Sequence, residues 1–176
     1  MKLWEKNNSS NDKIIDFTVG NDRQNDLYLI KYDIKASISH AKMLYRSNLL
    51  SEIECDKIIN ILNEMLSQAE AGKLKIDKEF EDMHSKIEFT LIDKLGDIGK
   101  KIHTARSRND QVLVSIQLYL IDELNSIKKE VKSLFDLLIN LAKKNKDTIM
   151  PGYTHMKAAM PSSFGLWFSA YAETLI

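Results

Sequence analysis

Ten residues near the middle of the chain, 102–111, concentrate the side chains best suited to chemistry. They read Ile-His-Thr-Ala-Arg-Ser-Arg-Asn-Asp-Gln, with two arginines, a histidine and several hydroxyl and amide groups. Ser107 followed by Asp110 has the form of a capping box, which predicts that a helix begins here. A helix start offers free backbone N–H groups and a positive dipole end, and Arg106 and Arg108 add full charges. The stretch therefore predicts an anion site, most naturally for a carboxylate or phosphate, although an ordinary capped helix beside a solvated basic loop explains it about as well.

A threonine and a histidine follow a break in the helical pattern. Pro151 and Gly152 end a long periodic segment, and Thr154 and His155 come directly after them. In a rigid turn, such a pair could bind a carboxylate and transfer a proton. A Thr-His pair is common, so the spacing alone leaves a purely structural explanation open.

Two other histidines lie in segments with helical spacing. His84 and Glu88 are four residues apart and share a face, but no third ligand is near them, so we predict no metal site. His84 is either a site residue or a structural helix histidine. His40 lies beside an apolar stripe, where a half-buried histidine bonded to a neighbour is the simplest interpretation.

The elements that position these residues are helices. The 176 residues include only 6 Gly and 2 Pro, and alternation typical of strands is hard to find, so we predict an all-α fold. Helices are expected over residues 26–46, from the capping box at 51–54 to Gly72, and over 80–95, 111–144 and 162–176. The fourth carries a heptad seam typical of a long bundle helix, formed by Leu120, Leu124, Ile127, Val131, Leu134, Leu138 and Leu141.

Three parts are expected along the chain. Residues 1–25 are mostly polar and predict an extended N-terminal arm. Residues 26–110 predict an N-terminal helical domain that carries the anion loop, and 111–176 the start of a central helical bundle. Three short helices cannot cover so long an apolar seam, so it needs partners from further chain or from other subunits.

Composition excludes several classes of protein. Lys plus Arg and Asp plus Glu are equal at 25 each, so no net charge points to a nucleic acid or a membrane surface. The single cysteine, Cys55, rules out an internal disulfide framework and fits a reducing compartment. The N-terminus lacks the apolar core of a signal peptide, and no apolar run reaches the length of a membrane span. We therefore expect a cytoplasmic protein, and we predict no cofactor.

Two of the motifs together resemble the signatures of the argininosuccinate lyases, a family of the fumarase/aspartase superfamily. The run from His103 to Gln111 resembles the first signature, and Pro-Gly-Tyr-Thr-His at 151–155 resembles the second. The resemblance extends from about Asp26 to Ile176. It implies an N-terminal helical domain that leads into a bundle of long helices.

The resemblance also implies an activity and its residues. The family cleaves argininosuccinate reversibly into arginine and fumarate, the closing step of arginine biosynthesis, in a homotetramer whose sites combine three subunits. Ser107, Arg108 and Asn109 are implied to bind substrate carboxylates. Thr154 is implied in binding and catalysis, and His155 in proton transfer. The segment Glu-Asp-Met-His-Ser-Lys-Ile-Glu at 81–88 resembles a further family motif, which places His84 at the substrate pocket.

The sequence departs from the family pattern in four places. The Gly-Gly-Arg element near the N-terminus is missing, residues 18–23 lack the serine that the family tends to place there, and Lys157 stands where the family has glutamine. The third signature, which carries the serine that removes the proton, is expected beyond residue 176. We therefore expect an incomplete part of the enzyme with negligible activity alone. A sister lyase (adenylosuccinate lyase or fumarase) and a non-catalytic helical oligomerisation fragment remain alternatives.

Overall fold

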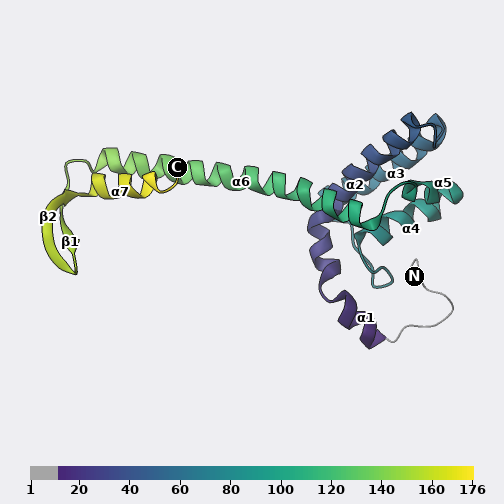
Figure 1. Ribbon diagram of the computed structural model, residues 1–176, viewed down its shortest axis with the longest axis horizontal. Coiled ribbons are helices and arrows are strands. Elements are labelled where there is room, and N and C mark those ends of the chain that lie inside the picture. Colours follow the sequence, from purple (N-terminus) through teal and green to yellow (C-terminus); the bar gives the residue numbers. More distant parts are fainter. Residues whose placement is uncertain (1–11) are drawn as a thin grey trace. The chain divides into compact units, whose positions relative to one another are not determined.

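The computed structural model describes residues 12–176, and helices dominate it (Figure 1). The predicted all-α class is confirmed, with one small antiparallel hairpin as the exception. The described chain divides into two compact units, the first extending to Leu120 and the second beginning at Ile121. The elements are α1 (Asp12–Val19), α2 (Asp22–Arg46), α3 (Glu52–Glu70), α4 (Met83–Leu95), α5 (Asp97–Lys100), a 3-10 turn (Lys101–His103), α6 (Arg108–Lys144), β1 (Ile149–Thr154), β2 (Lys157–Ser163) and α7 (Phe164–Glu173).

The core of the first unit lies between α2, α3 and α4. Their apolar residues recur at helical spacing, so each helix turns one stripe toward the other two. Full burial of such a side chain contributes roughly 1.5–3 kcal/mol, so this core is the main source of stability in the unit. Its most buried aliphatic members, each at most 1% exposed, are Ile34, Leu44, Ile58, Leu62, Ile87 and Leu91.

Local chemistry sets the ends of these helices. The predicted capping box at the start of α3 is present, because the Ser51 side chain accepts from the Glu54 N–H and the Glu54 carboxylate accepts from the Ser51 N–H. Gly72 follows the end of α3 at φ +65°, as a residue without Cβ can. The predicted start of α4 at residue 80 was three residues early. Asp82 accepts from the Ser85 N–H at 2.7 Å and caps a helix that begins at Met83.

The extended arm expected over residues 1–25 is wrong from residue 12 onward, and residues 1–11 lie outside the described part. Residues 12–19 form α1, and α2 begins at Asp22, four residues earlier than expected. No Gly or Pro interrupts residues 12–19, so nothing in this stretch opposes a helix. Val19 is only 3% exposed, so α1 ends with a buried apolar residue.

Helix α6 begins inside the first unit and continues into the second. Its first turns pack against α2, where the Tyr119 ring meets the Tyr32 ring edge-on with centroids 5.8 Å apart. Gln111 and Ser115 are buried in the same region. Further along, four residues of the predicted seam are about half exposed in the described chain, namely Leu120, Leu124, Ile127 and Leu134.

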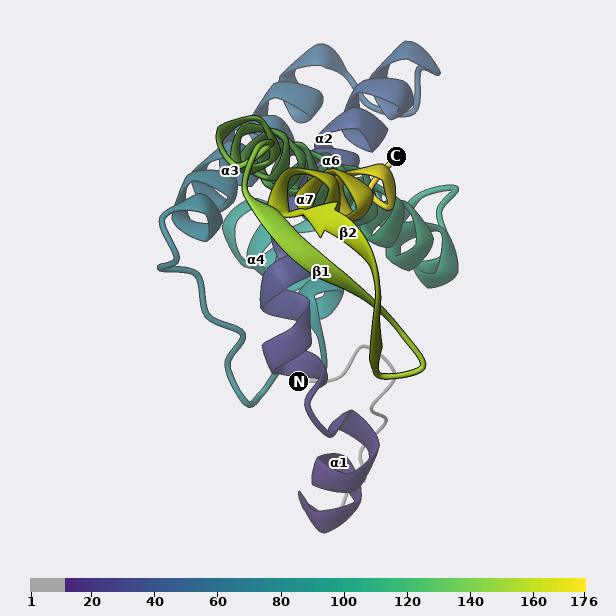
Figure 2. The ribbon, with the colours of Figure 1, turned by 90° about the vertical axis from the view of Figure 1, so that its left-hand side faces the viewer.

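The second unit contains the one element type that the sequence did not predict. Strands β1 and β2 pair antiparallel, with Ile149 opposite Ser163 and Thr154 opposite Lys157, and Figure 2 shows them as a twisted two-stranded ribbon. Helix α7 returns along the end of α6 (Figure 1). A Cβ on Gly165 would lie 2.6 Å from the Lys146 Cα, so this close approach requires glycine.

The hairpin turn holds two residues with left-handed backbone. His155 and Met156 have φ +49° and +60°, and they are the only two residues between the paired Thr154 and Lys157. Positive φ at both central positions matches a type I′ turn, which usually carries Asn-Gly. A residue with a Cβ is strained there by about 1–2 kcal/mol. Met156 is 97% exposed, so no packing within the chain offsets that strain.

Substitution at this turn tests the strain directly. Met156→Gly removes the Cβ and should stabilise the hairpin by about 1 kcal/mol, which is roughly a fivefold gain in amide hydrogen-exchange protection for the strands. Met156→Ala is the matched control, because it removes the exposed side chain but keeps the Cβ, and it should give no gain. Equal protection in the Gly and Ala variants would contradict a strained turn.

Candidate active site

The predicted helix start at the anion loop is present and is closed by a reciprocal capping box. The Ser107 N–H donates to Asp110 Oδ2 at 2.9 Å, and the Asp110 N–H donates to Ser107 Oγ at 3.3 Å. Hydrogen bonding from the Ser107 N–H, and next from the Ser107 hydroxyl, lowers the pKa of the Asp110 carboxyl. Among the described residues, the backbone N–H groups of Arg108 and Asn109 have no partner. Two donors at the positive end of α6 are therefore free to hold an anion.

Two side chains hold the loop that precedes this helix start. His40 donates from Nε2 to the Thr104 carbonyl at 2.9 Å, and Arg106 donates from Nη1 to Ser37 Oγ at 2.9 Å. Burial lowers the pKa of His40, and the nearby Arg106 charge lowers it further. Ala105, between the two contacts, has φ +57°. The loop thus keeps a costly backbone conformation because α2 fixes it on both sides.

Arg106 is also the most buried charge of the loop. Burial lowers the pKa of its guanidinium, and the carboxylates of Asp33 and Glu88 partly counteract that shift. Its Nε is the one buried side-chain nitrogen or oxygen without a partner in the described part of the chain. Arg106 therefore points inward, toward α2, and provides positive potential behind the loop.

Arg108 connects the loop to the start of α4. Its Nη1 lies 2.6 Å from Asp82 Oδ1, and Asp82 caps α4 at the same time. Burial by itself raises the pKa of Asp82, but the Ser85 N–H and the Arg108 charge outweigh it and hold this pKa below its usual value. Because its charge is paired, Arg108 fixes the helix start as well as adding to its potential.

His84 lies in the same buried region, beside α2 and α6. Its Nδ1 lies 2.8 Å from Asp33 Oδ2, and the two side chains are 4% and 0% exposed. Gln111 Nε2 donates to the other Asp33 oxygen at 3.4 Å. Sequence reasoning missed Asp33, although a signal was present. It lies on the same helix face as Ile30 and Ser37, where an acid is unusual.

The structure brings four of the six predicted site residues into one unit. His84, Ser107, Arg108 and Asn109 all belong to the first unit. Thr154 and His155 belong to the second, at the exposed end of the hairpin, where Lys157 is exposed as well. Capping chemistry predicted the helix start at Ser107 and resemblance assigned the site residues, whereas the turn geometry at His155 was not predicted.

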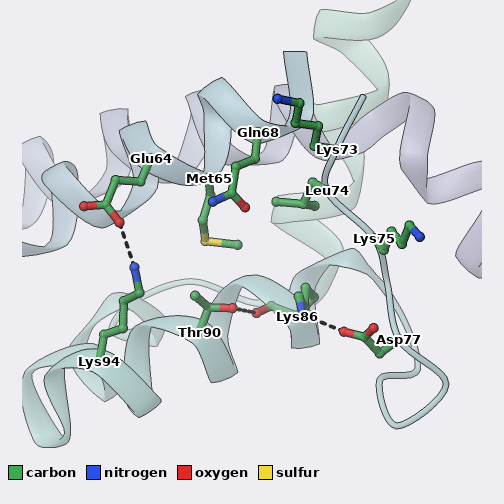
Figure 3. Close-up of a pocket in the computed structure, with 10 residues that line it drawn as sticks. All are labelled: Glu64, Met65, Gln68, Lys73, Leu74, Lys75, Asp77, Lys86, Thr90 and Lys94. Atoms are coloured by element: carbon green, nitrogen blue, oxygen red, sulfur yellow. Dashed lines mark hydrogen bonds and ion pairs between the residues drawn. The ribbon is translucent and has the colours of Figure 1, made fainter. Parts of the chain in front are cut away.

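A groove also lies in the first unit, between α3 and α4, and Figure 3 shows its lining. Its volume is about 300 Å³, and Met65 and Leu74 contribute its apolar surface. Lys94 pairs with Glu64 and Lys86 with Asp77, each at 2.7 Å. None of the predicted site residues lines this groove. Within each of the two ion pairs, the positive and the negative charge neutralise each other.

The described residues 12–176 contain no group of three or more His, Cys, Asp or Glu side chains placed to hold a metal ion. No helix in this part of the chain has the length and apolar character needed to cross a membrane.

Comparison with known proteins places the chain among lyases. The model of a family described as lyase matches residues 6–176. The chain is 50% identical over 99% of its length to an argininosuccinate lyase of Phocaeicola vulgatus, and 47% identical over 99% of its length to one of Thermotoga neapolitana. It spans 39% and 44% of those two relatives.

Solved structures agree on the fold. An EDDS lyase variant with bound fumarate matches with a TM-score of 0.71 and 26% identity, over 84% of this chain and 29% of that one. A fumarate lyase:delta crystallin from Brucella melitensis matches with a TM-score of 0.72 over 86% of this chain and 38% of that one, and its 17% identity supports the fold alone.

The pairing of Arg108 with Asp82 can be measured by a double-mutant cycle. Asp82→Asn keeps a good N-cap but removes the charge, so it should cost about 0.5–1 kcal/mol of unfolding free energy, because side chains that stay partly exposed are screened by solvent. In a chain that already carries Arg108→Gln, the same substitution should cost much less. Urea denaturation near neutral pH measures both, and fully additive losses would contradict the pairing.

Proposed function

The chain belongs to the lyase family whose model matches it, and on that premise we propose that it is part of an argininosuccinate lyase. The proposed reaction is the reversible β-elimination of argininosuccinate to arginine and fumarate, which closes arginine biosynthesis. Relatives of that name, at 50% and 47% identity, support this choice over the sister lyases. A cytoplasmic location belongs to the proposal and rests on the lone cysteine.

The observation that carries the proposal is the start of α6. Two unpartnered backbone N–H groups, the helix dipole and the nearby Arg108 charge converge on one short segment. In a β-elimination of this kind, negative charge accumulates on the carboxylate beside the carbon that loses a proton. Donors fixed before the substrate arrives stabilise that charge without having to reorganise. The Ser107–Asp110 capping box and the contacts made by His40 and Arg106 provide this fixed arrangement.

The remaining roles are divided between the two units. Ser107 and Asn109 are exposed beside the free N–H groups and suit the carboxylates of the substrate. We assign Thr154 to another carboxylate and His155 to proton transfer at the leaving nitrogen or to orientation of the proton carrier. The serine that resemblance assigns to proton abstraction belongs to a signature that residues 1–176 do not contain. No cofactor is needed for these steps.

Assembly into a homotetramer is a further part of the proposal. Four residues of the α6 seam, Leu120, Leu124, Ile127 and Leu134, are about half exposed in the described chain, and exposed apolar side chains aligned in this way are typical of interfaces. Pairing of such seams between subunits, at the shallow angles of long-helix bundles, buries these residues. In such an assembly, residues of different subunits can share a site.

A titration with fumarate tests the proposed carboxylate site in this chain. The backbone amides of residues 104–110 should shift selectively at millimolar ligand, because the free donors are local to one helix start. Asn109→Asp places a negative charge there and should abolish the shifts, whereas Asn125→Asp, on an exposed part of the same helix, should not. Uniform shifts, or shifts confined to the groove between α3 and α4, would contradict a site at this loop.

A further inference from the structure

Asp33 carries a carboxylate that the proposed reaction does not yet use. It is fully buried on α2, with His84 of α4 on one oxygen and Gln111 of α6 on the other. Residues 33 and 84 are 51 positions apart, and 33 and 111 are 78 apart. One carboxylate therefore joins three helices at the side of the anion loop.

We propose that Asp33 is a positioning residue, which holds His84 in the single tautomer that presents Nε2 as a hydrogen-bond acceptor to the nitrogen-bearing part of the substrate. This inference rests on the proposed function. It adds a residue that the motifs do not assign, and it gives His84 a defined role toward an N–H rather than toward a carboxylate.

The tautomer follows from the contact. An ionised carboxylate only accepts hydrogen bonds, so the 2.8 Å contact requires a proton on His84 Nδ1. A neutral imidazole carries one ring proton, so Nε2 is then left with its lone pair. The carboxylate of Asp33 in turn offsets part of the effect of burial on the pKa of Arg106, so the two charges interact across the buried region.

The other ring nitrogen of His84 is free to meet a ligand. Among residues 12–176, Nε2 has no hydrogen-bond partner, and the sole buried side-chain nitrogen or oxygen without one is Arg106 Nε. Nε2 therefore faces the small part of His84 that stays accessible, 4% of the residue. An acceptor that is held rigidly and left open is suited to one precise contact.

The chemistry of the neighbouring groups decides which contact this is. Carboxylates of the substrate are matched by donors, namely the N–H groups of Arg108 and Asn109. A lone pair on Nε2 repels a carboxylate but accepts an N–H, which argininosuccinate and arginine carry and fumarate lacks. His84 thus discriminates for the nitrogen-bearing half of the substrate.

Stability alone is a poor explanation of the Asp33–His84 pair. Burying a carboxylate is costly, and well-packed apolar residues of similar size are often at least as stable. A purely structural pair would fix the same tautomer through the same contact, but it would not require Nε2 to be left open. The tautomer is therefore a necessary condition of the proposal, and the two interpretations differ in turnover, because only a positioning role predicts a lower kcat with unchanged carboxylate binding.

The first test uses the unmodified chain. Nitrogen-15 NMR of labelled histidines near neutral pH reports the tautomer of each of the four rings, and His84→Gln assigns the signal of His84. We expect one tautomer, with the proton on Nδ1. A proton on Nε2, or an even mixture of tautomers, would overturn the proposal.

The second test uses Asp33→Asn. The new amide either accepts from Nδ1–H or donates to a bare Nδ1, so His84 should lose its single tautomer. In a chain extended to the length of its relatives, kcat for argininosuccinate should fall by at least about tenfold, whereas the fumarate-induced shifts at the loop should persist. Ser115→Ala is the matched control, because Ser115 is as buried as Asp33 and its side chain bonds only within its own helix. This variant should change neither the tautomer of His84 nor kcat.

The outcomes separate this inference from the proposed function. If the extended chain does not turn over argininosuccinate, the proposed function fails, while the tautomer of His84 is still measured. If turnover is present and Asp33→Asn preserves both the tautomer and kcat, Asp33 is structural and the inference is wrong.

Discussion

The burial of one carboxylate organises the first unit of this protein. Asp33 is fully enclosed, and a charge there is tolerated only if donors and an opposite charge surround it. His84 and Gln111 supply the donors, and Arg106 supplies positive potential. These three side chains come from α4, from α6 and from the loop before α6. The requirement to compensate one buried charge thus brings together the elements that form the proposed site.

The anion loop illustrates how binding geometry is fixed before a ligand is present. Its backbone is costly at Ala105, and contacts from His40 and Arg106 on either side maintain it. After the loop, the capping box pairs the N–H groups of Ser107 and Asp110. The N–H groups of Arg108 and Asn109 stay free to bind a ligand. The folding energy of α2, α3 and α4 therefore supports an arrangement that the loop would not adopt by itself.

The sequence predicted what local chemistry determines and missed what long-range contacts determine. The capping boxes at Ser51 and Ser107 were predicted correctly, because their partners lie three residues away. Asp33 was missed because its partners lie 51 and 78 residues away. The β-hairpin was missed because His155 and Met156 replace the usual Asn-Gly of a type I′ turn. The roles of the predicted site residues, from His84 to His155, stay predictions.

The most direct measurement is a crystal structure of the chain, extended to the length of its relatives, with fumarate bound. We expect one carboxylate of fumarate within hydrogen-bond distance of the N–H groups of Arg108 and Asn109, with the Asp33–His84 contact unchanged from the unliganded protein. Fumarate bound in the groove between α3 and α4, or a rearranged loop in which His84 has left Asp33, would contradict a site preformed around the buried carboxylate.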